Sequence, residues 1–202
     1  DYLMKYTNNG YSLTGKTILE LGPGSDFGTG IYMLSRGCSQ YNAIDVFNLM
    51  KKTPKSFYEL LLNRLQSKNV MTDIGFLKQQ VEDALAGNPS RINCVVRDDF
   101  DILKAFGLSN IDLVVSQAAF QAFDDIEKTV SQLSAVCRGG AVFIAEIDLR
   151  TLSRWIRDKD PNNIYRYSAN IYKWFRFRGI ANRIRPFQYK EALERNGWTD
   201  VS

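Results

Sequence analysis

Apolar residues along this chain fall into two kinds of segment, and the two kinds alternate. Residues 17–21 and 42–45 are short, mostly apolar runs bounded by turn residues, which is typical of buried strands. Other segments repeat their apolar residues close to the 3.6-residue period of a helix. The helices predicted in this way cover residues 28–36, 56–67, 73–86, from 124 or 125 to about 137, and 188–196. This order predicts an α/β domain with a doubly wound, mostly parallel sheet flanked by helices.

A glycine-rich turn follows the first strand, and an acid ends the second. Glycines let the backbone approach a ligand closely, and a carboxylate on the next strand can accept hydrogen bonds from both ribose hydroxyls. The residues in these positions are Gly22, Gly24 and Gly28 in the turn and Asp45 at the strand end. The turn alone fits a tight strand–helix connection. Paired with Asp45, it predicts a site for a nucleoside-containing cofactor.

Details of the turn indicate the kind of cofactor. The dinucleotide fingerprint G-x-G-x-x-G would place its third glycine one residue before Gly28. Glu20 and Asp26 would repel a pyrophosphate but favour a cation, which disfavours a NAD-dependent dehydrogenase. In these residues the sequence resembles the class I S-adenosylmethionine-dependent methyltransferases, whose first motif runs acid-x-Gly-x-Gly. The resemblance implies a Rossmann-like fold that binds S-adenosyl-L-methionine and releases S-adenosyl-L-homocysteine.

The resemblance extends over residues 16–150. The segments that look like the family's third, fourth and fifth strands are 91–99, 111–117 and 138–146. The resemblance implies that Glu20 meets the amino-acid end of the cofactor, directly or through backbone or water. In the family, an acid at the end of the third strand usually binds the adenine amino group. The remaining cofactor residues that it implies are Asp98, with its neighbour Asp99 as the alternative for adenine, and Ser116 and Gln117 beside the methyl donor.

The chain departs from the family pattern after the fourth strand. Gln121 and Ala122 stand where the family often has an acid and a histidine. Methyl transfer from a sulfonium needs mainly proximity, alignment and exclusion of water. The departure leaves open a carboxylate or tyrosine base, an acceptor that is already nucleophilic, or a cofactor-binding protein without catalysis. The catalytic residue is therefore not identified, and Gln121 is assigned to the acceptor site.

Composition narrows the choice of chemistry. The 202 residues include no histidine, which excludes Ser/His/Asp hydrolysis and histidine-ligated metal sites within this chain. Its three cysteines lack C-x-x-C spacing, so we expect core residues in a reducing cytoplasm and no metal site. No apolar run approaches the roughly 20 residues that span a bilayer.

Residues 47–90 are longer than a simple crossover needs and contain two predicted helices. They form either a two-piece crossover or a helical insertion whose first helix roofs the acceptor pocket. Residues 191–202 are predicted to begin a C-terminal strand unit, in which the helix over residues 188–196 ends at Gly197 and a sixth strand starts at residue 198. We therefore expect the whole chain to be a single domain whose C-terminal strands are incomplete, and the natural protein to be longer.

A basic and aromatic segment follows residue 150. Residues 150–190 carry eleven Lys and Arg against two acids, a net charge of +9. The segment is either a solvated amphipathic helix whose arginine stems cover apolar surface, or a lid over the acceptor. It is loosely similar to lids of small-molecule and sugar-associated methyltransferases. The lid interpretation, over residues 151–190, assigns Tyr172, Arg176 and Arg178 to an acceptor that is small or glycan-like, and anionic. RNA is the less favoured acceptor, because the rest of the chain is net acidic.

Overall fold

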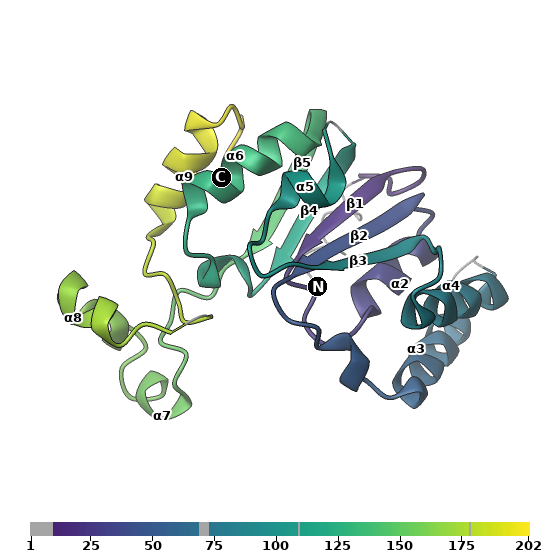
Figure 1. Ribbon diagram of the computed structural model, residues 1–202, viewed down its shortest axis with the longest axis horizontal. Coiled ribbons are helices and arrows are strands. Elements are labelled where there is room, and N and C mark those ends of the chain that lie inside the picture. Colours follow the sequence, from purple (N-terminus) through teal and green to yellow (C-terminus); the bar gives the residue numbers. More distant parts are fainter. Residues whose placement is uncertain (1–9, 69–72, 109, 178) are drawn as a thin grey trace.

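The computed structural model describes residues 10–68, 73–108, 110–177 and 179–202. At its centre lies one parallel sheet with the strand order β3-β2-β1-β4-β5 (Figure 1). The strands are β1 (Thr17–Leu21), β2 (Gln40–Asp45), β3 (Ile92–Val96), β4 (Ile111–Gln117) and β5 (Cys137–Glu146). The chain moves outward from β1 to β3 and then returns to β4. This reversal places the carboxyl ends of β1 and β4 side by side at the switch point of the sheet.

Helices cover both faces of the sheet. One face packs on α2 (Gly28–Ser35), α3 (Lys55–Ser67) and α4 (Ile74–Ala86), and the other on α5 (Ile102–Phe106), α6 (Ile126–Val136) and α9 (Pro186–Arg195). Neighbouring residues of β1 serve opposite faces: Ile18 joins the first core, and Leu19 joins the second. The prediction of a doubly wound sheet flanked by helices is confirmed.

Local signals set the helix ends. The Asp73 and Asp125 side chains accept hydrogen bonds from the backbone N–H of Phe76 and Lys128, which caps α4 and α6 at their first turns. Gln188 accepts from the Arg185 N–H at the start of α9, two residues before the predicted helix. The prediction did not include α5, and it gave no bounds for α7 (Arg154–Arg157) or α8 (Ala169–Trp174) in the basic segment. These helices have four to six residues each and show too little periodicity.

The predicted strand from residue 198 is wrong. Residues 198–202 join no strand of the described chain, and Asp200 has a left-handed φ of 56°, which interrupts an extended backbone. Trp198 instead packs on Phe143 of β5, with ring centroids 5.8 Å apart.

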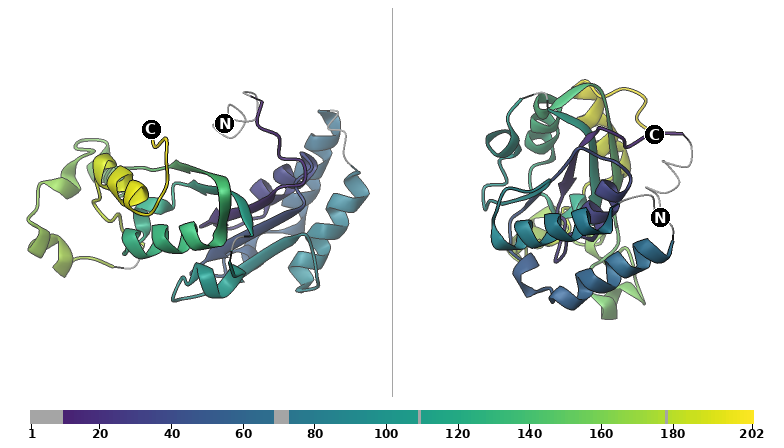
Figure 2. Two further views of the ribbon diagram at one scale, coloured as in Figure 1. Left: turned by 90° about the horizontal axis from the view of Figure 1, so that it is seen from above. Right: turned by 90° about the vertical axis from the view of Figure 1, so that its right-hand side faces the viewer.

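The basic segment that was interpreted as a lid, residues 151–190, leaves the two helical layers before its last residues join α9. Its helices α7 and α8 stand at the end of the molecule opposite α3 and α4 (Figures 1 and 2). Between them lies a single turn of 3-10 helix, η3 (Asn163–Tyr165). No helix in the described part of the chain is both long and apolar enough to cross a membrane.

Candidate cofactor site

The glycine turn joins β1 to α2 at the switch point. Gly22 and Gly24 have φ of 70° and 77°, a left-handed conformation that favours glycine. The Gly22 N–H donates to the Ile44 carbonyl oxygen at 2.9 Å, and the Gly28 N–H donates to Asp26 Oδ1 at 2.7 Å. These bonds fix the turn against β2 and at the start of α2.

The loop after β4 lies directly against this turn. A Cβ atom added at Gly22 would stand 2.5 Å from the Ala119 Cβ, whereas one added at Gly24 would meet nothing within 4 Å. Gly22 is therefore required for close packing as well as for its backbone conformation. Gly24 faces open space at the same turn, where a ligand can approach the backbone.

Glu20 is buried beneath the turn. It is 4% exposed, accepts a hydrogen bond from the Tyr41 hydroxyl, and accepts another from Thr29 Oγ1 at 3.3 Å. Burial raises the pKa of Glu20 from 4.5 to about 7, although the bonds from Tyr41 and Thr29 act in the opposite direction. Its carboxylate is thus held inside the protein.

The Tyr41 ring has room to reach Glu20 because the position of α2 that faces the ring is a glycine, Gly30. A Cβ atom at Gly30 would lie 2.6 Å from the Tyr41 ring. Sequence reasoning missed Tyr41 and Thr29. The signal that could have found them is a second glycine, Gly30, two residues after Gly28 in a helix, where glycine usually marks a close approach.

Asp45 lies beside the turn at the end of β2. Leu21 pairs with Ile44, so the residues that follow each of them, Gly22 and Asp45, are neighbours across the strand ends. Asp45 is 8% exposed, and its Oδ1 accepts the Phe47 N–H at 2.9 Å. This arrangement leaves the Asp45 carboxylate at the switch point with one oxygen already oriented by the backbone.

The two acids after β3 differ in their surroundings. Arg97 donates to both carboxylate oxygens of Asp99, at 2.8 and 2.7 Å, and this pairing holds the pKa of Asp99 well below its usual range. Asp98 is exposed on the surface. Arg97 engages both Asp99 oxygens, so an adenine amino group would have to compete with Arg97 at Asp99. Asp98 and Asp99 both stay candidates for adenine.

Ser116 and Gln117, the two predicted residues at the end of β4, differ in how deeply they are buried. Ser116 is fully buried, and its Oγ donates to the Leu21 carbonyl oxygen at 3.2 Å, which ties β4 to β1. Gln117 is exposed at the strand end. Ala118 then takes a left-handed φ of 49° and donates its N–H to Glu146 at 2.9 Å. Gln117 is therefore the better placed of the two to meet a ligand.

Gln121 lies in η2 (Phe120–Ala122) and is 4% exposed. Its Nε2 donates to the Ala118 carbonyl oxygen at 2.7 Å, but its Oε1 has no hydrogen-bond partner among the described residues. A buried acceptor without a donor is unusual and marks a place where a ligand or water can bind.

The basic segment is tied to this loop by polar contacts. Asn182 donates its N–H to the Gln121 carbonyl oxygen at 2.7 Å and its side-chain amide to the Phe123 carbonyl oxygen at 3.0 Å. The Asn182 side-chain oxygen also accepts from the Tyr189 hydroxyl at 3.0 Å. Asn182, which sequence reasoning did not identify, therefore joins the loop after β4, the lid and α9.

Two predicted acceptor residues of the lid are engaged within the protein. The Tyr172 hydroxyl donates to the Ala181 carbonyl oxygen at 2.6 Å, and the Arg183 guanidinium lies 4.8 Å from the Tyr172 ring centre. Arg176 forms an ion pair with Asp124. Arg178 lies outside the described residues. As placed here, Tyr172 and Arg176 stabilise the lid, so any acceptor must compete for them or bind beside them.

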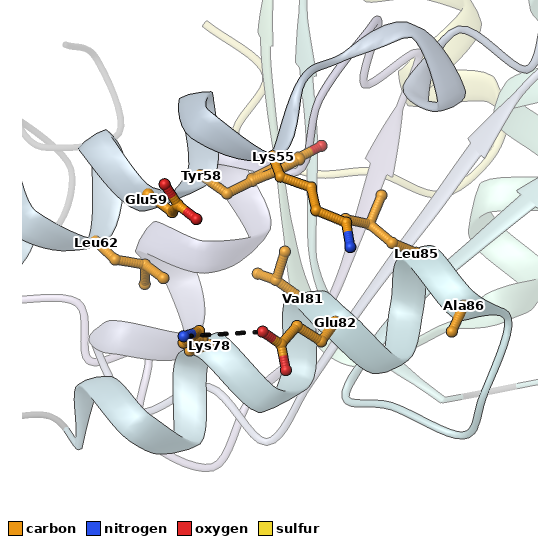
Figure 3. Close-up of a pocket in the computed structure, with 9 residues that line it drawn as sticks. All are labelled: Lys55, Tyr58, Glu59, Leu62, Lys78, Val81, Glu82, Leu85 and Ala86. Carbon is orange, nitrogen blue, oxygen red and sulfur yellow. Dashed lines mark ion pairs between the residues drawn. The ribbon is translucent and has the colours of Figure 1, made fainter.

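A cavity of about 210 Å³ lies between α3 and α4 (Figure 3). Its lining residues are Lys55, Tyr58, Glu59, Leu62, Lys78, Val81, Glu82, Leu85 and Ala86. None of them is among the residues that the sequence analysis assigned individually to the cofactor or the acceptor. The two helices pack against the same core as α2.

The cysteines occupy structural positions. Cys38 and Cys137 are buried, Cys94 is partly buried, and burial raises the pKa of each thiol to about 12. Within the described ranges, no group of three His, Cys, Asp or Glu side chains is arranged to hold a metal ion.

Solved structures resemble this chain over nearly its whole length. A Haemonchus contortus phosphoethanolamine N-methyltransferase 2 in complex with S-adenosyl-L-methionine aligns with a TM-score of 0.56 at 17% identity, over 98% of this chain and 36% of that one. An S-adenosylmethionine-dependent methyltransferase from Mesorhizobium loti aligns with a TM-score of 0.55 at 15% identity, over 96% and 79%. The CurJ carbon methyltransferase aligns with a TM-score of 0.51 at 17% identity, over 98% and 45%.

These likenesses identify the fold, which is the Rossmann-like fold of class I S-adenosylmethionine-dependent methyltransferases. By sequence, the chain matches no protein-family model and no curated protein. It spans about a third of the length of the phosphoethanolamine N-methyltransferase structures that it resembles.

Proposed function

We propose that this chain is the cofactor-binding part of an S-adenosyl-L-methionine-dependent methyltransferase. The observation that carries the proposal is the junction of the left-handed glycine turn with Asp45 at the switch point of the sheet. Two resembling structures are complexes of phosphoethanolamine N-methyltransferase 2, one with S-adenosyl-L-methionine and one with S-adenosylhomocysteine, which supports this choice of cofactor.

In this proposal, each residue of the site contacts a different part of the cofactor. Asp45 accepts hydrogen bonds from the ribose hydroxyls, and the backbone at Gly24 borders the amino-acid end. Asp98 accepts from the adenine amino group, and Gln117 borders the methyl donor. Glu20 acts from beneath the turn through its bonds to Tyr41 and Thr29, and a cationic cofactor nearby would favour its ionised form. The sulfonium and ammonium groups of the cofactor are cations, so the nearby carboxylates attract them.

The acceptor in this proposal is a small, anionic or glycan-like molecule bound between the loop after β4 and the basic lid. The buried, unpartnered Oε1 of Gln121 supports a polar ligand at this place. Catalysis rests mainly on proximity and alignment, because the donor is already activated. The absence of histidine, and Gln121 with Ala122 in place of an acid and histidine, also support a second candidate, a cofactor-binding protein without turnover.

Parallel calorimetric titrations with S-adenosyl-L-methionine, S-adenosyl-L-homocysteine and NAD test the proposal. We expect micromolar binding of the first two and no binding of NAD. Binding of NAD alone would contradict it, as would binding of none of the three. Turnover with a panel of amines, phosphate monoesters and glycans then separates the enzyme from the non-catalytic candidate.

A further inference from the structure

A set of large apolar side chains is exposed at the end of the molecule formed by residues 152–177, which we call the aromatic tip. Trp155 and Trp174 are 86% and 82% exposed, and the helices α7 and α8 that carry them bury none of their residues. The other exposed members are Leu152, Ile156, Tyr167, Ile171, Phe175 and Phe177. Both helices stand outside the layers of the domain (Figures 1 and 2). Large exposed apolar side chains that gather at one end of a molecule, rather than lying scattered singly, mark a contact with another body.

The aromatic tip has a defined structure of its own. The Thr151 N–H donates to the Pro161 carbonyl oxygen at 2.7 Å, and the N–H of the buried Ile164 donates to Thr151 Oγ1 at 3.2 Å. The Tyr165 hydroxyl donates to the Leu149 carbonyl oxygen at 2.9 Å. These bonds anchor the inner side of the tip to the chain after β5. The apolar side chains therefore point outward from an ordered backbone.

The same surface is cationic. Residues 152–177 contain six Lys and Arg against two Asp, a net charge of +4. One of the two acids, Asp160, is paired with Arg166. The cations that form no ion pair with any residue the structure describes include Arg154, Lys159 and Lys173. A partner for this surface must therefore offer both negative charge and an apolar phase.

We propose that the aromatic tip docks on an anionic lipid surface. Tryptophan side chains favour the headgroup level of a bilayer, where one edge is apolar and the other wet. Short amphipathic helices lie in this interface with Trp, Phe and Leu buried and Lys and Arg outside. Basic side chains add attraction to anionic lipids. This proposal goes beyond the proposed function and does not depend on which cofactor the sheet binds.

Two other occupants fit the surface less well. A second copy of the chain would bring two cationic tips together, and their like charges would oppose the contact. Single-stranded nucleic acid would use aromatic rings for stacking on bases. However, Leu152, Ile156 and Ile171 share the surface and offer no ring, whereas acyl chains accept aliphatic and aromatic side chains alike.

Tryptophan fluorescence gives a direct readout, because two of the three tryptophans lie in the aromatic tip. The third, Trp198, packs on Phe143. We expect the emission to shift to the blue when the whole chain meets vesicles of phosphatidylcholine mixed with phosphatidylglycerol. Added salt should reverse much of the shift. Vesicles of pure phosphatidylcholine should give little shift of the emission. The absence of a shift with anionic vesicles would overturn the proposal.

Vesicle flotation with matched variants locates the contact. Arg154→Glu with Lys173→Glu should lower the vesicle affinity by at least about tenfold. Arg64→Glu with Lys68→Glu makes the same charge change at exposed positions in and just after the last turn of α3, and should leave most of the affinity. Trp155→Ala with Trp174→Ala should also abolish flotation, whereas Leu60→Ala, at a position 70% exposed on α3, should not. Equal losses in the tip and α3 variants would overturn the proposal.

The competing occupants have outcomes of their own in the same assays. A uridine oligonucleotide that binds the chain in the absence of any vesicle binding would overturn the proposal in favour of nucleic acid. Concentration-dependent dimerisation that shifts the tryptophan emission without lipid would overturn it in favour of a second copy.

Discussion

The glycine turn and the aromatic tip differ in how their apolar side chains are exposed: those around the turn are buried, and those of the tip face solvent. Around the turn, apolar residues such as Ile18 and Leu21 are fully buried, and even the carboxylate of Glu20 is enclosed and hydrogen-bonded. At the tip, Trp155 and Trp174 face water while backbone hydrogen bonds hold the inner side. Burial in the first region stabilises the fold, whereas the side chains of the second contribute little to it. The difference suggests that the tip is shaped by what it contacts outside the chain.

Gly22→Ala should give the largest loss of stability. A left-handed conformation costs a non-glycine residue about 1–2 kcal/mol, and the clash with Ala119 should add about 1–3 kcal/mol. Gly24→Ala is the matched control, because it has the same backbone conformation and open space around it. Urea unfolding measures both variants. Equal losses would contradict the contact between the turn and the loop after β4, and Ala119→Gly should relieve the added loss at Gly22.

Glu20→Gln should change how stability depends on pH. The pKa of Glu20 is about 7 in the folded chain, above its ordinary value of 4.5, so the unfolded chain releases this proton first as pH rises. Stability from this group is therefore complete below about pH 4.5 and is lost on the way up to pH 7, by roughly 3 kcal/mol. The variant should lack this decline. Urea unfolding across the range measures it, and parallel curves for both proteins would show that Glu20 does not titrate as described.

A pair of capping variants should give the smallest effects and separate the two regions most cleanly. Asp125→Ala removes the cap of α6, whose residues Val130 and Leu133 are in the core, and should lower the free energy of unfolding by about 1 kcal/mol. Ser168→Ala removes the equivalent cap of α8, which buries no residue. It should leave global unfolding nearly unchanged and speed amide exchange only within α8. A global loss in the second variant would mean that the tip is part of the cooperative unit.

Elements whose signals are local could be predicted from the sequence. The bounds of β1 and β4 agree with the prediction because each is a short apolar run between turn residues. The start of α4 follows from Asp73, whose side chain caps it, and its end from Gly87. The positions of Gly22 and Asp45 at the switch point follow from the order of the strands.

Other features depend on contacts between distant positions, which a single sequence does not reveal. The bond between Tyr41 and Glu20 requires Gly30 of another element to leave room for the ring. The pairing of Arg97 with Asp99, two residues away along the chain, also could not be predicted from the sequence. The composition of the lid was clear, but side chains that face outward show no periodicity from which its short helices could be predicted.

The most direct test of the cofactor site is calorimetric titration of S-adenosyl-L-methionine into the natural chain and Asp45→Ala. Loss of a charged partner for the ribose hydroxyls should weaken binding by about 10- to 100-fold. Asp83→Ala, at an acid on α4 away from the turn, is the control and should bind like the natural chain. Unchanged affinity in Asp45→Ala would contradict the placement of the cofactor at the switch point of the sheet.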